Sequence, residues 1–289
     1  MSTAPTVLVT GASSGIGETC ALRLEAAGYR VFAGVRRADD GERIRARASG
    51  RLDWTPLDVT DAAQIAAAAR AVGDAVGDAG LAGLVNNAGI AMGGPLEYVT
   101  ADDLRRQLEV NVVGLHAVTR AFLPLVRRAR GRIVHIGSIS GLVAAPFTGP
   151  YAASKHAVEA LADALRLELA PEGIHVSVVE PGQIRTAIWD KGLSQFQGFA
   201  DRVPAEGITR YGGRLKVFRW VLESAPRRAG APDLVADAVL HALRARKPRT
   251  RYVIGRDARL RLWLSRWLPD RAMDALTLGM LGRLERRLP

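Results

Sequence analysis

The sequence contains little cysteine and little lysine. Cys20 is the only cysteine among 289 residues, which excludes an intrachain disulfide framework and a cysteine-based metal cluster and predicts a reducing, cytoplasmic location. We expect Cys20 to be a small buried apolar residue, and we expect no metal site. Lysine occurs at four positions only. Each lysine therefore carries more information than usual.

Signal-peptide and membrane-spanning patterns are also lacking. The segment 1–6 is short and polar and leads directly into Val7-Leu8-Val9, so we expect no signal peptide. Two stretches without charge, 79–96 and 133–154, are interrupted by glycines or by prolines and hydroxyl residues. Neither stretch is typical of a membrane-spanning helix.

The charge balance is strongly basic. Lysine and arginine number 40 against 29 acidic residues, a formal net charge of +11, while 48% of the residues are hydrophobic. This composition excludes intrinsic disorder and raises the question of a polyanionic partner. The arginines are dispersed and no nucleic-acid recognition motif is present, so we expect no nucleic-acid binding.

Short apolar runs alternate with helical patterns along most of the chain. The predicted strands are 6–9, 30–35, 52–57, 83–86, 132–136, 175–180 and 252–254, and the predicted helices are 16–27, 61–77, 101–129, 151–170 and 232–246. The strands lack alternation of polar and apolar residues, as expected for strands covered by helices on both faces. The sequence predicts an α/β fold with one Rossmann-like, doubly wound parallel sheet.

Two segments fall outside this alternation. The first, 187–228, mixes aromatic residues with glycines and charges and is interpreted as a substrate loop within a domain that spans 1–255. The second, 256–289, repeats leucine, methionine and tryptophan at helical spacing, and Pro269 divides it into two amphipathic helices. With a net charge of +4, this extension could cover a substrate pocket, pack on a partner subunit or touch an anionic membrane surface.

A glycine-rich turn follows the first strand. Thr10-Gly11-Ala12-Ser13-Ser14-Gly15-Ile16-Gly17 leads from a strand into a helix. Glycines permit the sharp turn and the approach of a pyrophosphate, whose oxygens bind the free N–H groups of the first helical turn. A glycine turn without a ligand is the alternative.

Polar residues follow two later strands. Tyr151 and Lys155 share one helical face, and a nearby ammonium would bring the tyrosine pKa toward the working range for acid–base chemistry. Ser138, just past the fifth strand, is placed to bind a substrate oxygen. Asn111 interrupts an apolar helical run, where it is either functional or a satisfied structural residue.

These motifs together resemble the short-chain dehydrogenase/reductase family over residues 5–255. The resemblance includes Asn86-Asn87-Ala88-Gly89 after the fourth strand and Pro181-Gly182 after the sixth. It implies that Tyr151 is the general acid/base, that Lys155 lowers its pKa and holds the nicotinamide ribose, that Ser138 positions the carbonyl, and that Asn111 holds a water in a proton relay. It also implies a homodimer or homotetramer formed through helices near 101–129 and 151–170.

The residues at the end of the second strand indicate which nicotinamide cofactor is preferred. An acidic residue there would select NAD(H), but Val35 is followed by Arg36 and Arg37, which favours the 2′-phosphate of NADP(H). Asp39 and Asp40 are close behind and leave NAD(H) as the alternative. The expected cofactor-binding residues are Gly11, Ser13, Ser14, Ile16, Gly17, Arg36, Arg37, Asp58, Val59, Asn87, Ala88, Gly89, Tyr151, Lys155, Pro181, Gly182, Ile184 and Thr186.

Two of these groups depend on the resemblance. Asp58-Val59 resembles the pair that contacts adenine, with a helix cap as the alternative role of Asp58. Ile184 and Thr186 match the segment that touches the nicotinamide carboxamide. The aromatic residues of 187–228 suggest a lid over a lipophilic, steroid-, retinoid- or polyketide-like substrate, or else a loop that packs its own aromatic rings.

The sequence therefore predicts an oxidoreductase that interconverts alcohol and carbonyl groups with NADP(H). The alternative is a dinucleotide-sensing regulatory protein of the same fold that binds the cofactor without turnover. Sugar-nucleotide epimerase chemistry is disfavoured because those relatives have a different glycine spacing and a longer C-terminal domain.

Overall fold

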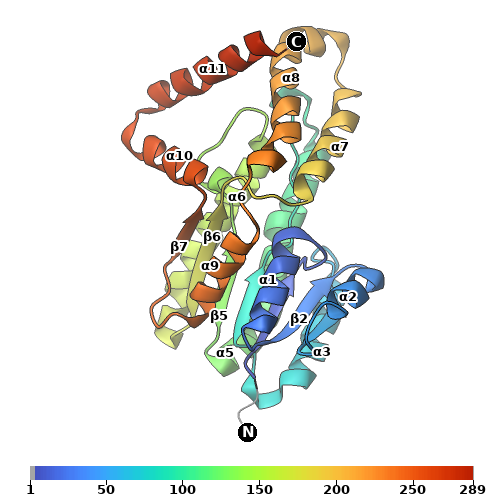
Figure 1. Ribbon diagram of the computed structural model, residues 1–289. Coiled ribbons are helices and arrows are strands. Elements are labelled where there is room, and N and C mark those ends of the chain that lie inside the picture. Colours follow the sequence, from blue (N-terminus) through green and yellow to red (C-terminus); the bar gives the residue numbers. More distant parts are fainter. Residues whose placement is uncertain (1–3, 289) are drawn as a thin grey trace.

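A seven-stranded parallel sheet forms the centre of the computed structural model, which describes residues 4–288 (Figure 1). The strand order is β3-β2-β1-β4-β5-β6-β7. The strands are β1 Thr6–Thr10, β2 Arg30–Val35, β3 Leu52–Pro56, β4 Gly83–Asn86, β5 Arg132–Ile136, β6 His175–Pro181 and β7 Arg251–Ile254. The doubly wound parallel sheet is confirmed, and each predicted strand agrees with the structure to within one residue at either end.

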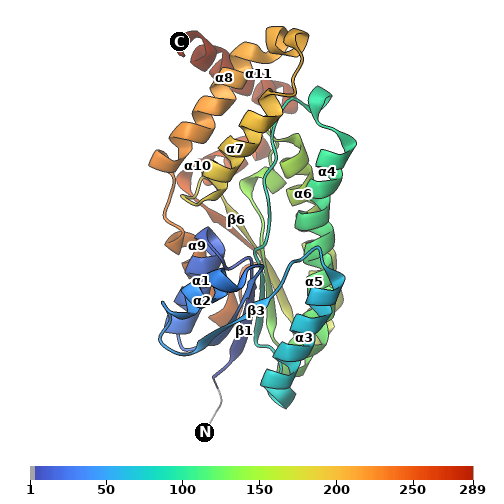
Figure 2. The same ribbon diagram turned by 90° about the vertical axis from the view of Figure 1, so that its right-hand side faces the viewer.

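Helices cover both faces of the sheet (Figure 2). On one face lie α1 Gly15–Ala26, α2 Ala38–Arg45 and α9 Asp233–Arg244. On the other face lie α3 Ala62–Val76, α4 Ala101–Leu108, α5 Leu115–Ala129 and α6 Gly149–Leu169. Short 3₁₀ turns occupy Gly77–Ala79, Leu96–Tyr98, Ile139–Gly141 and Ala170–Glu172. This arrangement explains why the strands are apolar on both faces.

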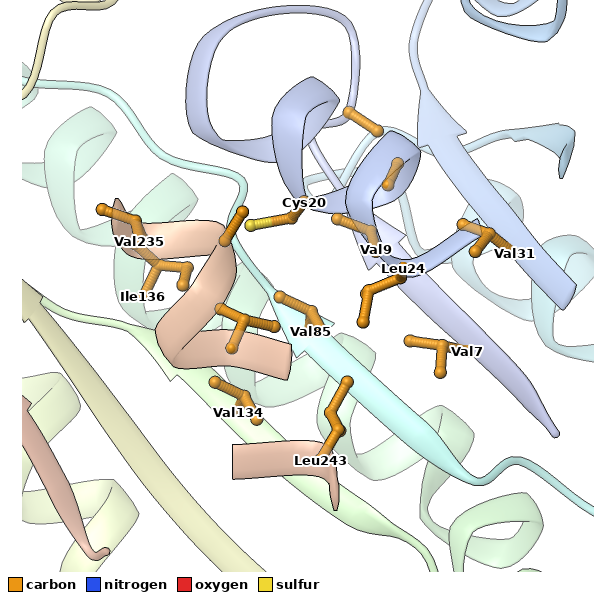
Figure 3. Close-up of a cluster of buried hydrophobic side chains, with 14 of the residues drawn as sticks. Val7, Val9, Cys20, Leu24, Val31, Val85, Val134, Ile136, Val235 and Leu243 are labelled. Atoms are coloured by element: carbon orange, nitrogen blue, oxygen red, sulfur yellow. The ribbon is translucent and has the colours of Figure 1, made fainter. Parts of the chain in front are cut away.

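Successive residues of a strand supply the two cores. Val7 and Val9 pack with Cys20 and Leu24 of α1 and with Val235 of α9 (Figure 3). Leu8, between the two valines, belongs to the opposite core with residues of α3, α5 and α6. Burying each such aliphatic side chain contributes roughly 1.5–3 kcal/mol. Cys20 is fully buried as predicted, and burial raises the pKa of its thiol to about 12.

The helices differ from the prediction in three places. The predicted helix 101–129 is interrupted by one π-helical segment, Glu109–Gly114, which contains Asn111. Helix α2 was not predicted. The segment 187–228 is largely helical, with α7 Ile188–Ala200 and α8 Ala205–Arg228.

The helices of segment 187–228 and those of the extension 256–289 both lie at the carboxyl end of the strands, opposite the N-terminus (Figures 1 and 2). The extension forms α10 Arg256–Trp267 and α11 Asp270–Arg287, divided at Pro269 as predicted. Helix α10 packs beside β7, and α11 packs against α8. No helix within residues 4–288 is long and apolar enough to cross a membrane.

Candidate active site

The glycine-rich turn after β1 is tightly packed. Gly11 and Gly15 have φ angles of 63° and 59°, which disfavour residues with a Cβ. A Cβ on Gly17 would lie 2.3 Å from Asn87 Nδ2 and 2.4 Å from the Gly11 carbonyl oxygen. Only glycine therefore fits at this first turn of α1.

The start of α1 offers unpaired donors. Ser14 is the N-cap residue, but its side chain makes no capping hydrogen bond to the helix. The first N–H groups of a helix have no partner within it and favour anionic oxygens. The turn 11–17 thus fits the pyrophosphate of a dinucleotide, and Ser13, Ser14 and Ile16 lie where the sequence predicted them, around this helix start.

The segment after β4 braces the same turn. Asn87 Nδ2 donates hydrogen bonds to the carbonyl oxygens of Thr10, at 2.9 Å, and Gly11, at 3.1 Å. The backbone N–H groups of Asn87 and Ala88 both donate to Thr10 Oγ1 at 3.0 Å. Asn87 is therefore bound to the glycine-rich turn through its side chain, and Gly89 follows beside Asn111.

Arg36 and Arg37 are exposed beyond the end of β2. The two nearby carboxylates are engaged in the first turn of α2: Asp39 lies 3.4 Å from Arg37, and Asp40 lies 3.3 Å from Arg43. Arg43 also contacts the carbonyl oxygen of Ser13 in the glycine-rich turn. Arg43 could not be singled out from the sequence, because it lies on α2, which the sequence does not predict.

Asp58 and Val59 follow β3. Asp58 Oδ1 accepts hydrogen bonds from the N–H and Oγ1 of Thr60. The N-cap of α3 is Asp61, whose side chain accepts from Ala63 and Gln64, so the alternative role of Asp58 as helix cap is wrong. Val59 is buried against Gly114.

Tyr151, Lys155 and Ser138 come together beyond the carboxyl end of β5. Lys155 Nζ lies 5.8 Å from the centre of the Tyr151 ring and donates a 2.7 Å hydrogen bond to the Ile136 carbonyl oxygen. Ser138 lies within hydrogen-bonding reach of the Tyr151 hydroxyl. The i, i+4 spacing on α6 thus places both side chains beside the serine.

Burial dominates the acid–base behaviour of this group. It raises the pKa of Tyr151, against a smaller lowering by the hydrogen bond with Ser138. Burial lowers the pKa of Lys155 to about 8, against the raising effect of the nearby Glu159 charge. Tyr151 is therefore a neutral phenol at neutral pH, able to donate its proton.

Asn111 is buried in the π-helical segment, and its side chain makes three hydrogen bonds. Its Oδ1 accepts from Ile90 N–H at 2.9 Å, and its Nδ2 donates to the Ile90 carbonyl oxygen and to Ser154 Oγ, each at 3.0 Å. Ser154 immediately precedes Lys155. The Asn111 side chain thus joins the segment after β4 to α6.

The segment after β6 lies against the glycine-rich turn. A Cβ on Gly15 would lie 3.0 Å from Thr186 Cβ, so these residues are in contact. Ile184 is buried. Pro181-Gly182 ends the strand, and Asp257 of α10 accepts a 3.0 Å hydrogen bond from the N–H of Gln183. The sequence did not indicate Asp257, because its partner is far away in the chain.

Aromatic rings from α7 and α8 cover the loops beside the Tyr151, Lys155 and Ser138 group. Phe218 of α8 lies 5.4 Å from Phe196 of α7 and 5.8 Å from Phe147, measured between ring centres. Tyr211 lies 6.2 Å from both Phe147 and Tyr98. Phe196 and Phe218 therefore pack on each other, and Phe218 and Tyr211 pack on the loops that follow β4 and β5.

The described residues contain no cluster of three or more His, Cys, Asp or Glu side chains able to hold a metal ion. The predicted site residues instead gather at the carboxyl ends of the strands, where they form a glycine-rich anion cradle and a tyrosine–lysine–serine group under an aromatic cover. Such a site can hold a dinucleotide beside a proton donor.

Known proteins with similar sequences agree with the kind of site described above. The family model described as short chain dehydrogenase matches residues 5–195. Mouse "Retinol dehydrogenase 5" is 41% identical over 96% of this chain and 89% of its own length. Human "17-beta-hydroxysteroid dehydrogenase type 6" is 40% identical over 93% of this chain and 86% of its own length.

Solved structures agree. A short-chain dehydrogenase from Streptomyces avermitilis has a TM-score of 0.77 and 29% identity, covering 98% of both chains. A short chain dehydrogenase from Burkholderia cenocepacia, solved in complex with NADP, has a TM-score of 0.71 and 27% identity, covering 96% of this chain and 99% of that one. The chain therefore belongs to the short-chain dehydrogenase/reductase family of oxidoreductases.

Proposed function

We propose that this protein interconverts a lipophilic alcohol and the corresponding ketone or aldehyde with NADP(H), using Tyr151 as general acid/base. The observation that carries the proposal is the grouping of Tyr151, Lys155 and Ser138 at the same carboxyl edge of the sheet as the glycine-rich anion cradle. The 1–255 domain would hold the whole reaction centre, and the 256–289 extension would support it.

A nicotinamide bound at this site would supply or accept the hydride at the carbonyl carbon. Ser138 holds the substrate oxygen by a hydrogen bond, and the Tyr151 hydroxyl donates its proton to that oxygen in the direction of reduction. In oxidation the tyrosinate takes the proton back from the alcohol. The raised pKa of Tyr151 supports the protonated form as the resting state.

Lys155 stabilises the charge that forms on Tyr151. Its Nζ lies on the ring side of the tyrosine and is oriented by the Ile136 carbonyl oxygen. An ammonium near the phenol favours tyrosinate and so lowers the barrier to proton donation. When cofactor is bound, the same ammonium would hold the nicotinamide ribose, whereas the Asn111 amide would fix α6 and the segment after β4.

The preference for NADP(H) is supported by the exposed arginines after β2. Arg36 and Arg37 would face the 2′-phosphate, and Asp40 is paired with Arg43 rather than left to bind a ribose hydroxyl. The pyrophosphate would lie on residues 11–17. Asp58 and Val59 would contact the adenine, and residues 87–89 together with Pro181, Gly182, Ile184 and Thr186 would enclose the nicotinamide half.

A lipophilic substrate is supported by the relatives and by the aromatic cover. The names of the similar proteins specify a retinol and a hydroxysteroid as substrates. In this chain Phe147, Phe196 and Phe218, from three segments, pack edge to face, and we propose that they form an apolar wall of the substrate site. Apolar walls with a few polar groups are typical of small-molecule sites.

Two exposed surfaces of the protein are suited to contact binding partners. Leu104 of α4, Val113 of the π-helical segment and Leu167 of α6 are exposed, and we propose that this part of the molecule contacts a second subunit in a homo-oligomer. On the extension, Trp263 and Trp267 are 58% and 72% exposed among arginines, a combination suited to peripheral contact with an anionic membrane. A cytoplasmic location is proposed on the basis of the single unpaired thiol.

The test is a cofactor-oxidation screen that compares NADPH with NADH on retinoid-like, steroid-like and shorter aliphatic carbonyl compounds. We expect faster oxidation of NADPH, and turnover with the bulky lipophilic compounds. A strong preference for NADH would contradict the role of Arg36 and Arg37. Tight cofactor binding without turnover on any compound would favour the dinucleotide-sensing alternative.

A further inference from the structure

A row of charged residues runs along the buried side of α6, starting at the active site. Lys155, Glu159 and Asp163 are spaced four residues apart and therefore lie on one face of the helix. Lys155 and Glu159 are each only 6% exposed, whereas the Asp163 side chain is 42% exposed. The row thus leads from the active-site lysine toward solvent.

Two residues of the sheet face this row. Glu180 on β6 is completely buried, and Arg251 lies on the neighbouring strand β7. Arg251 Nε lies 3.0 Å from Glu159 Oε2 and 3.3 Å from Glu180 Oε1, and its Nη2 lies 2.7 Å from Asp163 Oδ2. One guanidinium therefore serves three carboxyl groups.

The two buried glutamates lack enough partners to be ionised together. Both Glu180 oxygens and Glu159 Oε1 are buried and have no hydrogen bond. Two carboxylates that share one cation repel each other, and an unpaired buried charge is costly. A single proton held between the two groups removes the repulsion and provides a donor for one of the unpartnered oxygens.

This pair reaches the active-site loop. A Cβ on Gly137 would lie 3.0 Å from Glu159 Oε1, and one on Gly141 would lie 3.3 Å from Glu159 Cγ. Gly137 immediately precedes Ser138. Glycines at both ends of this short loop therefore let the Glu159 side chain pack against the loop that carries Ser138, one helical turn from Lys155.

We propose that Glu159 and Glu180, joined through Arg251, share one proton and that the remaining negative charge of the pair keeps Lys155 in its ammonium form. Glu159 and Glu180 are then positioning residues that act through Lys155. This inference rests on the proposed function only for the role of Lys155, because the shared proton is a property of the protein alone.

The electrostatics of the surrounding groups agree with this reading. Burial raises the pKa of Glu180 to about 7, with Glu159 adding to the rise and Arg251 and, from α10, Arg266 opposing it. Burial likewise raises the pKa of Glu159, against the charges of Arg251 and Lys155, while Asp163 adds to the rise.

The remaining titratable groups near Lys155 are neutral at the relevant pH. His135 on β5 has its pKa lowered to about 4 by burial and by the Lys155 charge, and Tyr151 has its pKa raised by burial. Glu159 is thus the charge that raises the pKa of Lys155.

Infrared spectroscopy of the protein without substrate tests the shared proton. At a pH of about 6, below the pKa of about 7 of Glu180, the parent should show the C=O band of a protonated carboxyl group. Glu180→Gln should remove that band, because Glu159 then has Arg251 and Lys155 as cationic neighbours without a competing carboxyl group and ionises. Glu159→Gln should shift the band rather than remove it, because Glu180 stays buried but loses its carboxyl partner. Glu168→Gln, on the exposed side of the same helix, should leave the band unchanged.

The pH profile of kcat/KM tests the effect on Lys155. Glu159→Gln should move the alkaline limb of the profile to lower pH by about half a unit or more, and Glu168→Gln should leave it in place. A band that survives in Glu180→Gln, or an unmoved alkaline limb in Glu159→Gln, overturns the proposal. If Glu159→Gln does not fold, the band in Glu180→Gln decides, and it does so even if no turnover is found.

Discussion

Asp257 Oδ2 accepts a hydrogen bond of 3.0 Å from the backbone N–H of Gln183, so the first turn of α10 is tied to the segment that follows β6. A Cβ on Gly182 would lie 2.5 Å from the same oxygen, which shows how closely the carboxylate packs on this backbone. The extension therefore fixes a segment that also contacts the glycine-rich turn through Thr186.

Replacing Asp257 by alanine should weaken cofactor binding. The Gln183 N–H would lose its acceptor, and a hydrogen bond of about 1 kcal/mol corresponds to roughly a fivefold change in an equilibrium constant. We expect the KM for NADPH to rise by that order, with a smaller change in kcat. Asp274→Ala, an exposed acidic residue of α11, is the matched control. Equal KM values in the two variants would exclude the anchoring role.

Replacing Gly17 by alanine should damage the cofactor cradle. The added methyl group would collide with Asn87 and with the Gly11 carbonyl oxygen, and overpacking of this kind costs roughly 1–3 kcal/mol. We expect a lower midpoint of thermal unfolding and the loss of stabilisation by added NADPH. Gly279→Ala in α11, where the methyl group meets no atom within 4 Å, should leave the midpoint unchanged or raise it.

Replacing both Arg36 and Arg37 by serine should reduce the preference for NADPH. Hydrogen bonds to a charged phosphate contribute roughly 1.5–3 kcal/mol, so the KM for NADPH should rise on the order of tenfold or more. The KM for NADH should change little. Arg45→Ser removes an exposed arginine of α2 that is paired with Glu42, and it should affect neither cofactor. Unchanged NADPH kinetics in the double variant would place the 2′-phosphate elsewhere.

His135 should make the protein less stable in acid. It is 1% exposed and hydrogen-bonded to Asn86 Nδ2 at 3.2 Å, and its pKa falls from 6.5 to about 4 in the folded state. The unfolded chain therefore binds a proton more readily, so this stabilisation is complete above pH 6.5 and is lost as the pH falls toward about 4. The maximum effect is about 3 kcal/mol.

Chemical denaturation at neutral and acid pH measures this contribution. The parent should lose more unfolding free energy between the two conditions than His135→Gln, whatever the stability of that variant at neutral pH. Equal losses in the two proteins would mean that His135 does not titrate between the folded and unfolded states.

The sheet and much of the site could be predicted because their signals are local. Tyr151 and Lys155 are four residues apart on one helix, and the glycine-rich turn follows directly from β1, so spacing alone brings these residues into register. The ends of the strands could also be predicted, because each apolar run begins and ends close to the limits of its strand. The π-helical segment around Asn111 was not predictable, because the surrounding sequence has ordinary helical periodicity.

Other parts of the site depend on tertiary register. Arg251 and Glu159 are 92 residues apart in the chain and meet only because β7 pairs with β6 beneath α6. Asp257 and Gln183 meet for the same reason. The aromatic residues of α7 and α8 face several neighbours at once. Their sequences therefore lack the single apolar stripe by which a surface helix is recognised, and these helices could not be predicted.

The most direct test of the account is the turnover of Tyr151→Phe with NADPH and a lipophilic carbonyl substrate that the parent reduces. Phenylalanine keeps the ring beside Lys155 and removes only the proton donor, so kcat/KM should fall by roughly 10²–10⁴, while NADPH binding, measured by fluorescence, should stay within about twofold. A variant that oxidises NADPH as fast as the parent would contradict the assignment of Tyr151 as the general acid/base.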